Sequence, residues 1–224
     1  MLLSHAGYSQ VLISILLGDK LNSDKLEFGL EGGLNLSAIQ GLDQASSVSR
    51  FNLGFYFDIT LKQPSLIFHT GVLVKSAMGA KELPVYDVGD DDLNNAFEGG
   101  QVDRRLTYFN IPLLLKYKFR GDFYLEGGTM VGLRNKAEDI FTKKVINDDD
   151  LTYKVSVKDD IRPLDAGLLV GLGYRLMRGN GMNLGVRYYV GLVDVVIDDN
   201  SPDQYNRSMY FSLGIPIGKG KPEK

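Results

Sequence analysis

Apolar and polar residues alternate with a period of two along most of the chain. In residues 51–61 the odd positions are all phenylalanine, leucine or isoleucine, whereas the even positions include Asn52, Gly54 and Asp58. Side chains of a β-strand point alternately to its two faces, so this period indicates strands. The sequence therefore predicts an all-β chain with eight strands, at residues 26–38, 50–61, 65–76, 105–119, 122–134, 163–177, 181–192 and 207–217.

The connections between these segments alternate in length. Three are short and carry the Gly, Pro and Asn residues of tight turns: 62–65, 120–122 and 178–181. The others are long and polar: 39–49, 77–104, 135–162 and 193–206. Strands joined in this way form an up-and-down meander with all long loops at one end, which is the layout of outer-membrane barrels. We expect an eight-stranded antiparallel up-and-down transmembrane β-barrel over residues 26–217.

The polar face of the predicted strands combines charge with glycine. The interior of an eight-stranded barrel is only wide enough to hold side chains, so long charged residues fit there only beside small ones. Five acids and six bases nearly cancel, as enclosed charges should. We therefore predict a polar network that fills the lumen, in preference to a conducting pore, and that consists of Glu27, Glu31, Asp58, Lys75, Lys116, Lys118, Glu126, Arg134, Asp165, Arg175 and Arg187.

The alternative closed barrel is a soluble, lipocalin-like one with its apolar face inward. A water-facing strand surface gains nothing from many glycines, because glycine weakens strands. Phe109 and Phe119 share the apolar face ten positions apart. At about 3.3 Å per residue and the usual tilt, they stand roughly 25 Å apart along the membrane normal, which is the height of a barrel's apolar band. The membrane reading is favoured.

Two features interrupt the pattern. Pro112 lies in the middle of a predicted strand, where it removes a ladder hydrogen bond, so we expect a bulge or local break there. In segment 65–76, Ile67 and Leu73 fall on the face that is otherwise polar.

The two ends of the chain are assigned separately. Residues 11–17 form an apolar core long enough for a signal peptide, but no lysine or arginine precedes it. Residues 1–25 are thus either a residual signal or a short N-terminal helical segment, and the second is favoured. Residues 218–224 are predicted to be a polar tail.

The amino-acid composition argues against several classes of functional site. The net charge of -3 gives no basic signature for nucleic acid. Without cysteine there are no disulfides or thiolate metal sites. His5 and His69 are the only histidines, and His69 is assigned a structural role because a catalytic one would need a serine or carboxylate partner near the mouth. We expect no catalytic site, cofactor or metal.

Two local motifs are assigned to loops and turns. The acidic runs 90–92 and 148–150 could bind Ca²⁺ through oxygen ligands, but neither has an EF-hand spacing, so solvated loops are favoured. The sequence Arg120-Gly121-Asp122 is read as a tight periplasmic turn, not as an adhesion motif.

Several segments carry a family resemblance: YFNIPLLLKYKF (108–119), FYLEGGTMVGL (123–133), DAGLLVGLGYRL (165–176), NLGVRYYVGL (183–192) and ILLGDKLNSDKLEFGLEGGLNLS (15–37). Together they resemble the PorT-type outer-membrane β-barrel family of gram-negative bacteria. The resemblance implies an outer-membrane location and a small eight-stranded barrel, and the namesake is tied to protein secretion. The chain departs from the usual barrel terminus, because FSLGIPIGKGKPEK lacks a terminal aromatic residue.

These inferences leave four functions, in order of preference. The first is a non-enzymatic interaction, envelope-structural or secretion-associated protein that acts through loops 77–104 and 135–162, which mix acids with apolar residues. The second is a narrow porin or transport component, the third a soluble ligand-binding barrel and the last an enzyme. The expected partners are outer-membrane lipid and envelope or secretion proteins, and we expect a monomer that does not bind nucleic acid.

Overall fold

The computed structural model describes residues 23–217 except 24, 43–44, 120, 146–149, 180 and 199–201. Nine strands and two short helices follow one another in the described chain: β1 (Leu26–Gln40), β2 (Val48–Thr60), β3 (Leu66–Leu83), α3 (Asp91–Phe97), β4 (Gln101–Lys118), β5 (Phe123–Lys144), β6 (Asp150–Ser156), β7 (Leu164–Arg175), α4 (Leu176–Gly179), β8 (Asn183–Gly191) and β9 (Tyr205–Pro216). The predicted segment 1–25 and the tail 218–224 lie almost entirely outside the described residues.

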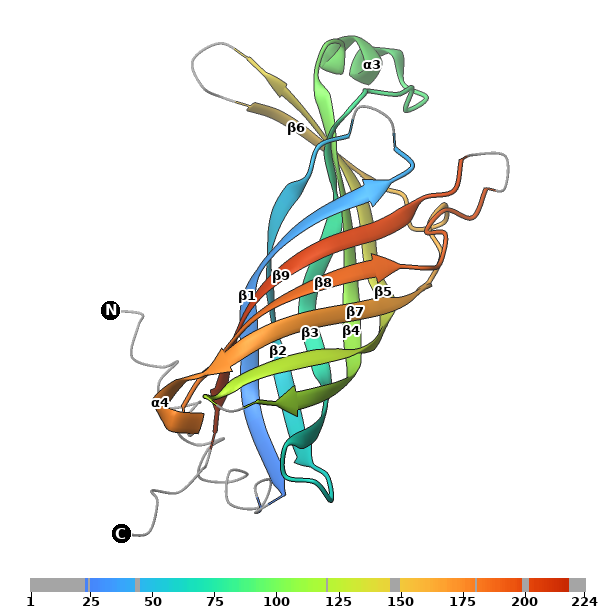
Figure 1. Cartoon of the computed structure of the whole chain (residues 1–224). Coiled ribbons are helices and arrows are strands. Elements are labelled where there is room, and N and C mark those ends of the chain that lie inside the picture. The colour runs from blue at the N-terminus through green and yellow to red at the C-terminus, as the bar shows by residue number, and fades with distance from the viewer. Residues whose placement is uncertain are drawn as a thin grey trace.

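Eight of the strands form a closed antiparallel ring. Each pairs with its neighbour in the order β1, β2, β3, β4, β5, β7, β8 and β9, and β9 pairs back with β1 from Gly29↔Pro216 to Gln40↔Tyr205. Figure 1 shows the strands inclined around the barrel, with the tight turns at the bottom and the longer connections at the top. We call these the turn end and the loop end. The predicted all-β, up-and-down barrel is confirmed.

The outer wall of the ring is apolar. Leu113 and Leu115 on β4, Leu125 on β5 and Leu172 on β7 are exposed, while the residues between them point into the barrel. Phe109 and Phe119 are both exposed on this wall, as the ten-residue spacing predicted. No helix among the described residues is long and apolar enough to cross a membrane. The wall has the alternating pattern of strands that face lipid on one side only.

The lumen has two layers instead of the single polar interior that the sequence predicted. The turn-end half holds buried charged residues. The loop-end half is filled mainly by apolar and tyrosine side chains, with small polar ones such as Asn35, Asn110 and Asn206 among them. We call the apolar and tyrosine side chains the apolar plug; they include Met78, Leu106, Tyr108, Met130, Leu169, Tyr189 and Tyr210. The alternating pattern could not predict this layer, because an apolar residue such as Leu106 or Leu169 can face either the lumen or the lipid.

The two interruptions of the pattern lie in β3 and in its neighbour β4. The register with β2 shifts between Leu53↔Lys75 and Gly54↔Leu73, so Val74 is an extra residue in a β-bulge. On the turn-end side of this bulge, Ile67 and Leu73 face the lumen and are buried. The register of β4 with β5 runs through Pro112 without a shift, so the expected bulge is absent. On the β3 side no described residue pairs with Ile111 or Pro112, which is the local break expected where proline lacks an amide hydrogen.

The two predicted loops 77–104 and 135–162 are largely secondary structure, which corrects the sequence assignment. Strand β3 continues to Leu83 and β5 to Lys144, and β6 adds a strand to the sheet beyond the barrel rim. We call this part, formed by residues 81–103, 139–145 and 150–156, the outer extension. It is a four-stranded sheet in the order β3, β4, β5 and β6, and Figure 1 shows it projecting from one side of the loop end together with α3. Bulges in β3 and β5 break the alternation here.

Candidate functional site

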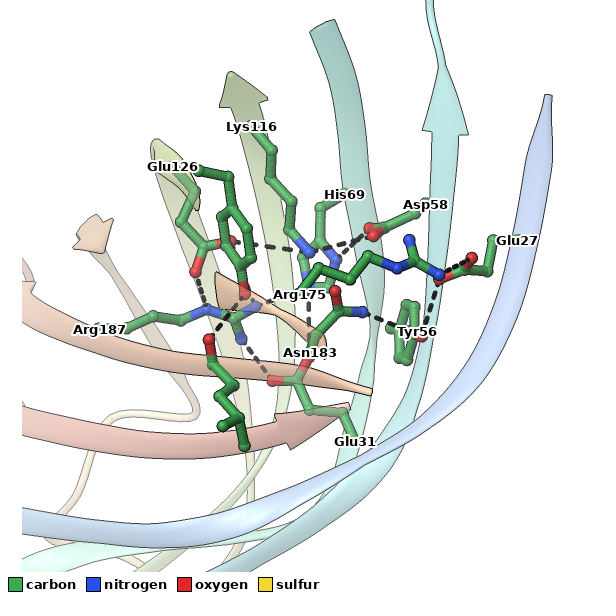
Figure 2. Close-up of polar contacts among 12 residues, drawn as sticks. Glu27, Glu31, Tyr56, Asp58, His69, Lys116, Glu126, Arg175, Asn183 and Arg187 are labelled. Atoms are coloured by element: carbon green, nitrogen blue, oxygen red, sulfur yellow. Dashed lines mark hydrogen bonds and ion pairs between the residues drawn. The ribbon is translucent and has the colours of Figure 1, made fainter. Parts of the chain in front are cut away.

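A cluster of buried charges occupies the turn-end half of the lumen. Figure 2 shows its members converging from β1, β2, β3, β4, β5, β7 and β8. We call it the charge cluster, and it consists of Glu27, Glu31, Asp58, His69, Lys116, Glu126, Arg175 and Arg187. All eight residues are buried, so each charge is separated from bulk water and depends on its neighbours.

Arg187 of β8 is the centre of the cluster. Its Nε donates to Glu126 Oε1 at 2.5 Å, and its Nη1 donates to Glu31 on the opposite wall. The guanidinium therefore joins β5 to β1 across the lumen. A fork of several donors on one planar group is suited to two carboxylates, which a lysine cannot serve in the same geometry.

Lys116 of β4 forms the second centre. Its ammonium lies 3.2 Å from Asp58 Oδ2 and 3.8 Å from Glu126 Oε2, and it also lies over the rings of Tyr56 and Tyr124. Glu126 thus links the two centres, because it contacts both the lysine and Arg187. The apolar segment around Lys116 carries a lysine because that strand faces lipid on one side and carboxylates on the other.

His69 belongs to the cluster, although the sequence analysis found no carboxylate partner for it. Its Nδ1 lies 2.6 Å from Asp58 Oδ1, and its Nε2 lies 3.4 Å from Glu31 Oε2 and 3.2 Å from Arg187 Nη2. Its described polar partners are carboxylates and a guanidinium, and none is a nucleophile of the kind that histidine activates in acyl transfer. His69 occupies a lumen-facing position of β3 and pairs with Asp58 in the ladder. A polar residue at such a position is the sequence feature that could have indicated its membership of the cluster.

A third group of contacts lies nearer the turn end. Arg175 Nη2 donates to Glu27 Oε2 at 2.5 Å, and the Tyr56 hydroxyl donates to the same carboxylate at 3.0 Å. Asn183 donates to Tyr56 at 3.3 Å. Tyr56 and Asn183 were not predicted as network members, since neither carries a charge.

Glycines make room for these long side chains. A Cβ at Gly171 would lie 2.8 Å from Arg187 Cγ, and one at Gly173 would lie 2.2 Å from Tyr124 Cζ. The space bounded by Glu31, His69 and Arg187 is too small for a water molecule. Among the described residues, the side chains of the charge cluster therefore occupy the barrel cross-section at that level.

The structure separates four predicted members from the cluster. Lys75 is exposed on the outer wall, because the bulge at Val74 reverses its face. Arg134 donates to the backbone oxygens of Lys158 and Ile161 at the loop end. Lys118 is only partly buried and lines the turn-end mouth. Asp165 is buried but lies in the apolar plug, where Asn206 donates to it at 2.8 Å. The prediction of a lumen position was wrong for Lys75, whereas Arg134 shares the inward face with Tyr108 but lies away from the charge cluster.

Planar-bilayer recording tests whether the two layers close the lumen. We expect no steady, large single-channel currents from the purified barrel, because the charge cluster and the apolar plug both obstruct the path. The control is a variant with Met78, Leu106 and Met130 replaced by alanine, in which the plug is opened while the charges remain. Steady large currents from the parent protein would instead favour a porin.

The outer extension is a second candidate site, and it has its own apolar core. Phe97 of α3 packs with Leu83, Val102 and Phe141. Asp90 begins the helix by accepting a hydrogen bond from Leu93 N at 3.0 Å, so this acidic run acts as a helix cap. In the second run, Asp148 and Asp149 lie outside the described residues. Within the described part of the chain, no group of three or more His, Cys, Asp or Glu side chains could hold a metal ion.

A polar triad fixes the base of the extension. Arg104 donates to Asp139 through Nε at 2.9 Å and Nη2 at 2.7 Å, and the Tyr86 hydroxyl donates to the same carboxylate at 3.0 Å. Burial raises the pKa of Tyr86, and the neighbouring Asp139 raises it further, so the hydroxyl keeps its proton and remains a donor. These contacts join β4, β5 and the segment before α3. The extension is therefore an ordered platform.

A closed ring of antiparallel strands with an apolar outer wall and a filled, charged lumen is the architecture of a small outer-membrane β-barrel. The chain belongs to the outer membrane protein beta-barrel domain family, whose sequence model matches residues 19–196. It is an integral protein of the outer membrane. In barrels of this kind the short turns are periplasmic and the long connections face outward, so we expect the loop end and its extension outside the cell and the turn end in the periplasm.

Solved structures of small outer-membrane barrels are similar in fold. Ail, the attachment invasion locus protein of Yersinia pestis, is 10% identical with a TM-score of 0.46, over 87% of this chain and 99% of that one. Neisserial surface protein A is 10% identical with a TM-score of 0.48, over 84% and 96%. OprG from Pseudomonas aeruginosa is 13% identical with a TM-score of 0.33, over 86% and 93%. No curated protein matches the sequence.

Proposed function

We propose that this protein is a non-enzymatic outer-membrane barrel that binds a partner outside the cell through its outer extension. The observation that carries the proposal is the projecting four-stranded sheet, whose last strand, β6, pairs with β5 on one side only among the described residues. The barrel beneath it is filled, so the extension is the part of the molecule that is both ordered and accessible. Binding functions commonly reside on such segments, held by a rigid scaffold.

The free edge of β6 is suited to an extended segment of another protein. An unpaired strand edge presents a row of backbone donors and acceptors that a further strand can satisfy. On this strand Leu151 and Tyr153 are 40% and 38% exposed, although neither faces lipid. Alternating apolar side chains beside a free backbone edge would provide both affinity and register for a partner strand.

The resemblance to PorT-type barrels supports a finer form of the proposal, in which the partner belongs to the cell envelope or to a secretion apparatus. The charge cluster has no part in this function beyond holding the wall closed. A narrow porin remains the alternative, and the filled lumen argues against it. We further propose that the barrel itself is monomeric, since its ring is closed without a second copy.

Shortening the two hairpins of the extension tests the proposal. Ala80 pairs with Arg104, and Glu138 pairs with Ser156, so short Gly/Ser turns can replace residues 81–103 and 139–155 without altering the barrel ladders. We expect the shortened protein to keep its heat-modifiable gel mobility. It should fail to complement a strain that lacks the gene.

Shortening one hairpin at a time is the matched control. Loss of β6 alone should abolish complementation, whereas a shortened α3 connection that retains β6 should preserve most of it. If the doubly shortened protein still complements the deletion, the function lies in the barrel wall or on the periplasmic side.

A further inference from the structure

The outer wall carries three cations just beyond the loop-end limit of its apolar band. They lie on three adjacent strands: Lys75 on β3, Arg105 on β4 and Lys136 on β5. The last large apolar residues that are exposed on the same wall are Phe51, Val74, Phe109 and Leu133. These cations therefore stand where the hydrocarbon region gives way to the headgroups of the outer leaflet.

The β-bulge places Lys75 on this wall. Val74 and Lys75 are consecutive and both exposed, which regular alternation does not allow. The pairs Leu73↔Asn110 and Ser76↔Tyr108 set Lys75 level with Phe109. Its ammonium lies 5.9 Å from the centre of the exposed Phe51 ring. A lysine at this depth is tolerated when its stem lies along apolar surface and its charge reaches the headgroups.

Arg105 reaches the same wall by ordinary alternation and is half-buried, whereas Lys136 follows a second bulge, in which Asn135 is the extra residue. Leu106 and Ala137 are buried in the plug, so the residues that precede them point outward. Lys136 contacts Glu138 at 2.5 Å, and Glu138 is also the ladder partner of Arg105. Asp103, two residues from Arg105, is paired with Arg50. Apart from that pair, three cations thus share one carboxylate, and the patch is net positive.

The spacing suits more than one phosphate. From strand separation and rise, the Cα atoms of Arg105 and Lys136 lie roughly 8 Å apart, and those of Lys75 and Lys136 about 12 Å apart. Because the lysine and arginine side chains are long, their charged groups can contact phosphates that are further apart or closer together than these Cα distances. Cations near a membrane surface each strengthen the attraction to anionic headgroups by about fivefold in the binding constant.

We propose that Lys75, Arg105 and Lys136 bind the phosphate groups of a phosphorylated glycolipid of the outer leaflet, with its acyl chains against the apolar wall below. Lys75 stands level with Phe109, and Arg105 and Lys136 lie beyond Phe109 and Leu133. A headgroup that carries acyl chains can contact both these cations and the exposed apolar wall. This inference is independent of any partner of the extension.

The test uses folded protein in phosphatidylcholine nanodiscs that contain either lipid A or lipid A from which the phosphates have been removed. Native mass spectrometry then counts the lipid A molecules that remain on each barrel after release from the disc. We expect retention of phosphorylated lipid A only. Equal retention of both forms, or of neither, would overturn the proposal, and this comparison needs no variant.

A triple variant, Lys75→Gln with Arg105→Gln and Lys136→Gln, should weaken retention by on the order of 100-fold. The matched control removes the same charge elsewhere, with Lys62→Gln, Lys144→Gln and Lys158→Gln, and should retain lipid A as the parent does. Glu138→Gln removes the single acid and should strengthen binding. An equal loss in the control triple, or competition by soluble polyglutamate as strong as that by lipid A, would show a general attraction for anions and contradict the assignment.

Discussion

Replacing Arg187 with methionine should destabilise the folded barrel by about 3–5 kcal/mol, which is the usual cost of breaking a buried ion pair by removing one partner. The arginine contacts Glu126 at 2.5 Å and also Glu31, so both carboxylates lose their strongest donor. Methionine fills much of the same volume, which keeps the cavity small. Urea unfolding in lipid vesicles measures the change.

The matched control neutralises the two partners as well. Arg187→Met combined with Glu31→Gln and Glu126→Gln should be less destabilised than Arg187→Met alone, because no buried charge is left without a partner. Lys144→Met, at an exposed position outside the barrel, should behave as the parent. If the single variant is as stable as the triple, the charges of the cluster are not coupled as the distances indicate.

Leu115→Arg should destabilise the barrel by about 2–4 kcal/mol, the cost of a charge on the lipid face near the midplane. Leu115 is 46% exposed on the outer wall, between the aromatic residues Phe109 and Phe119 that mark its two ends. No headgroup is within reach of an arginine at this depth. Urea unfolding in vesicles of matched thickness gives the free-energy difference.

The control for depth is Phe119→Arg, which introduces the same charge at the turn-end limit of the apolar band. There the cost should fall to roughly 0–1 kcal/mol, beyond the loss of the ring itself. A Leu115→Arg protein as stable as the parent would reverse the assignment of the two faces.

The barrel was predictable because lipid and lumen impose opposite demands on alternate residues. In β2, Phe51, Leu53 and Phe55 lie on the outer wall, while Asn52 and Asp58 are buried in the lumen. The two environments therefore produce an alternation of apolar and polar residues that is visible in the sequence. The outer extension has no lipid on either side. One of its faces packs on α3 and the other meets water, and its bulges shift the phase, so residues 77–83 and 136–144 resembled loops.

The charge cluster was predictable only in part. Glu126, Lys116 and Arg187 were predicted correctly, because a charged side chain within an apolar strand must point into the lumen and away from lipid. Lys75 was misplaced because a one-residue bulge reverses the face of every residue after it, and composition alone does not show where a bulge lies. Tyr56 and His69 were not predicted as members, because the prediction rested on carboxylates, lysines and arginines.

The pairing of β1 with β9 makes the kinetics of assembly depend on the last part of the chain. The partners Gly29 and Pro216 are separated by nearly the whole described sequence, so the final ladder closes the longest possible loop. Until β9 arrives, β1 presents an open edge to the bilayer, where unsatisfied backbone groups are costly. Folding and insertion must therefore be concerted, and a ribosome or translocation machinery that releases the chain gradually cannot produce a stable partial barrel. Truncation of a few residues from β9 should slow assembly far more than an equal truncation within a surface loop, because it removes the contacts of highest sequence separation.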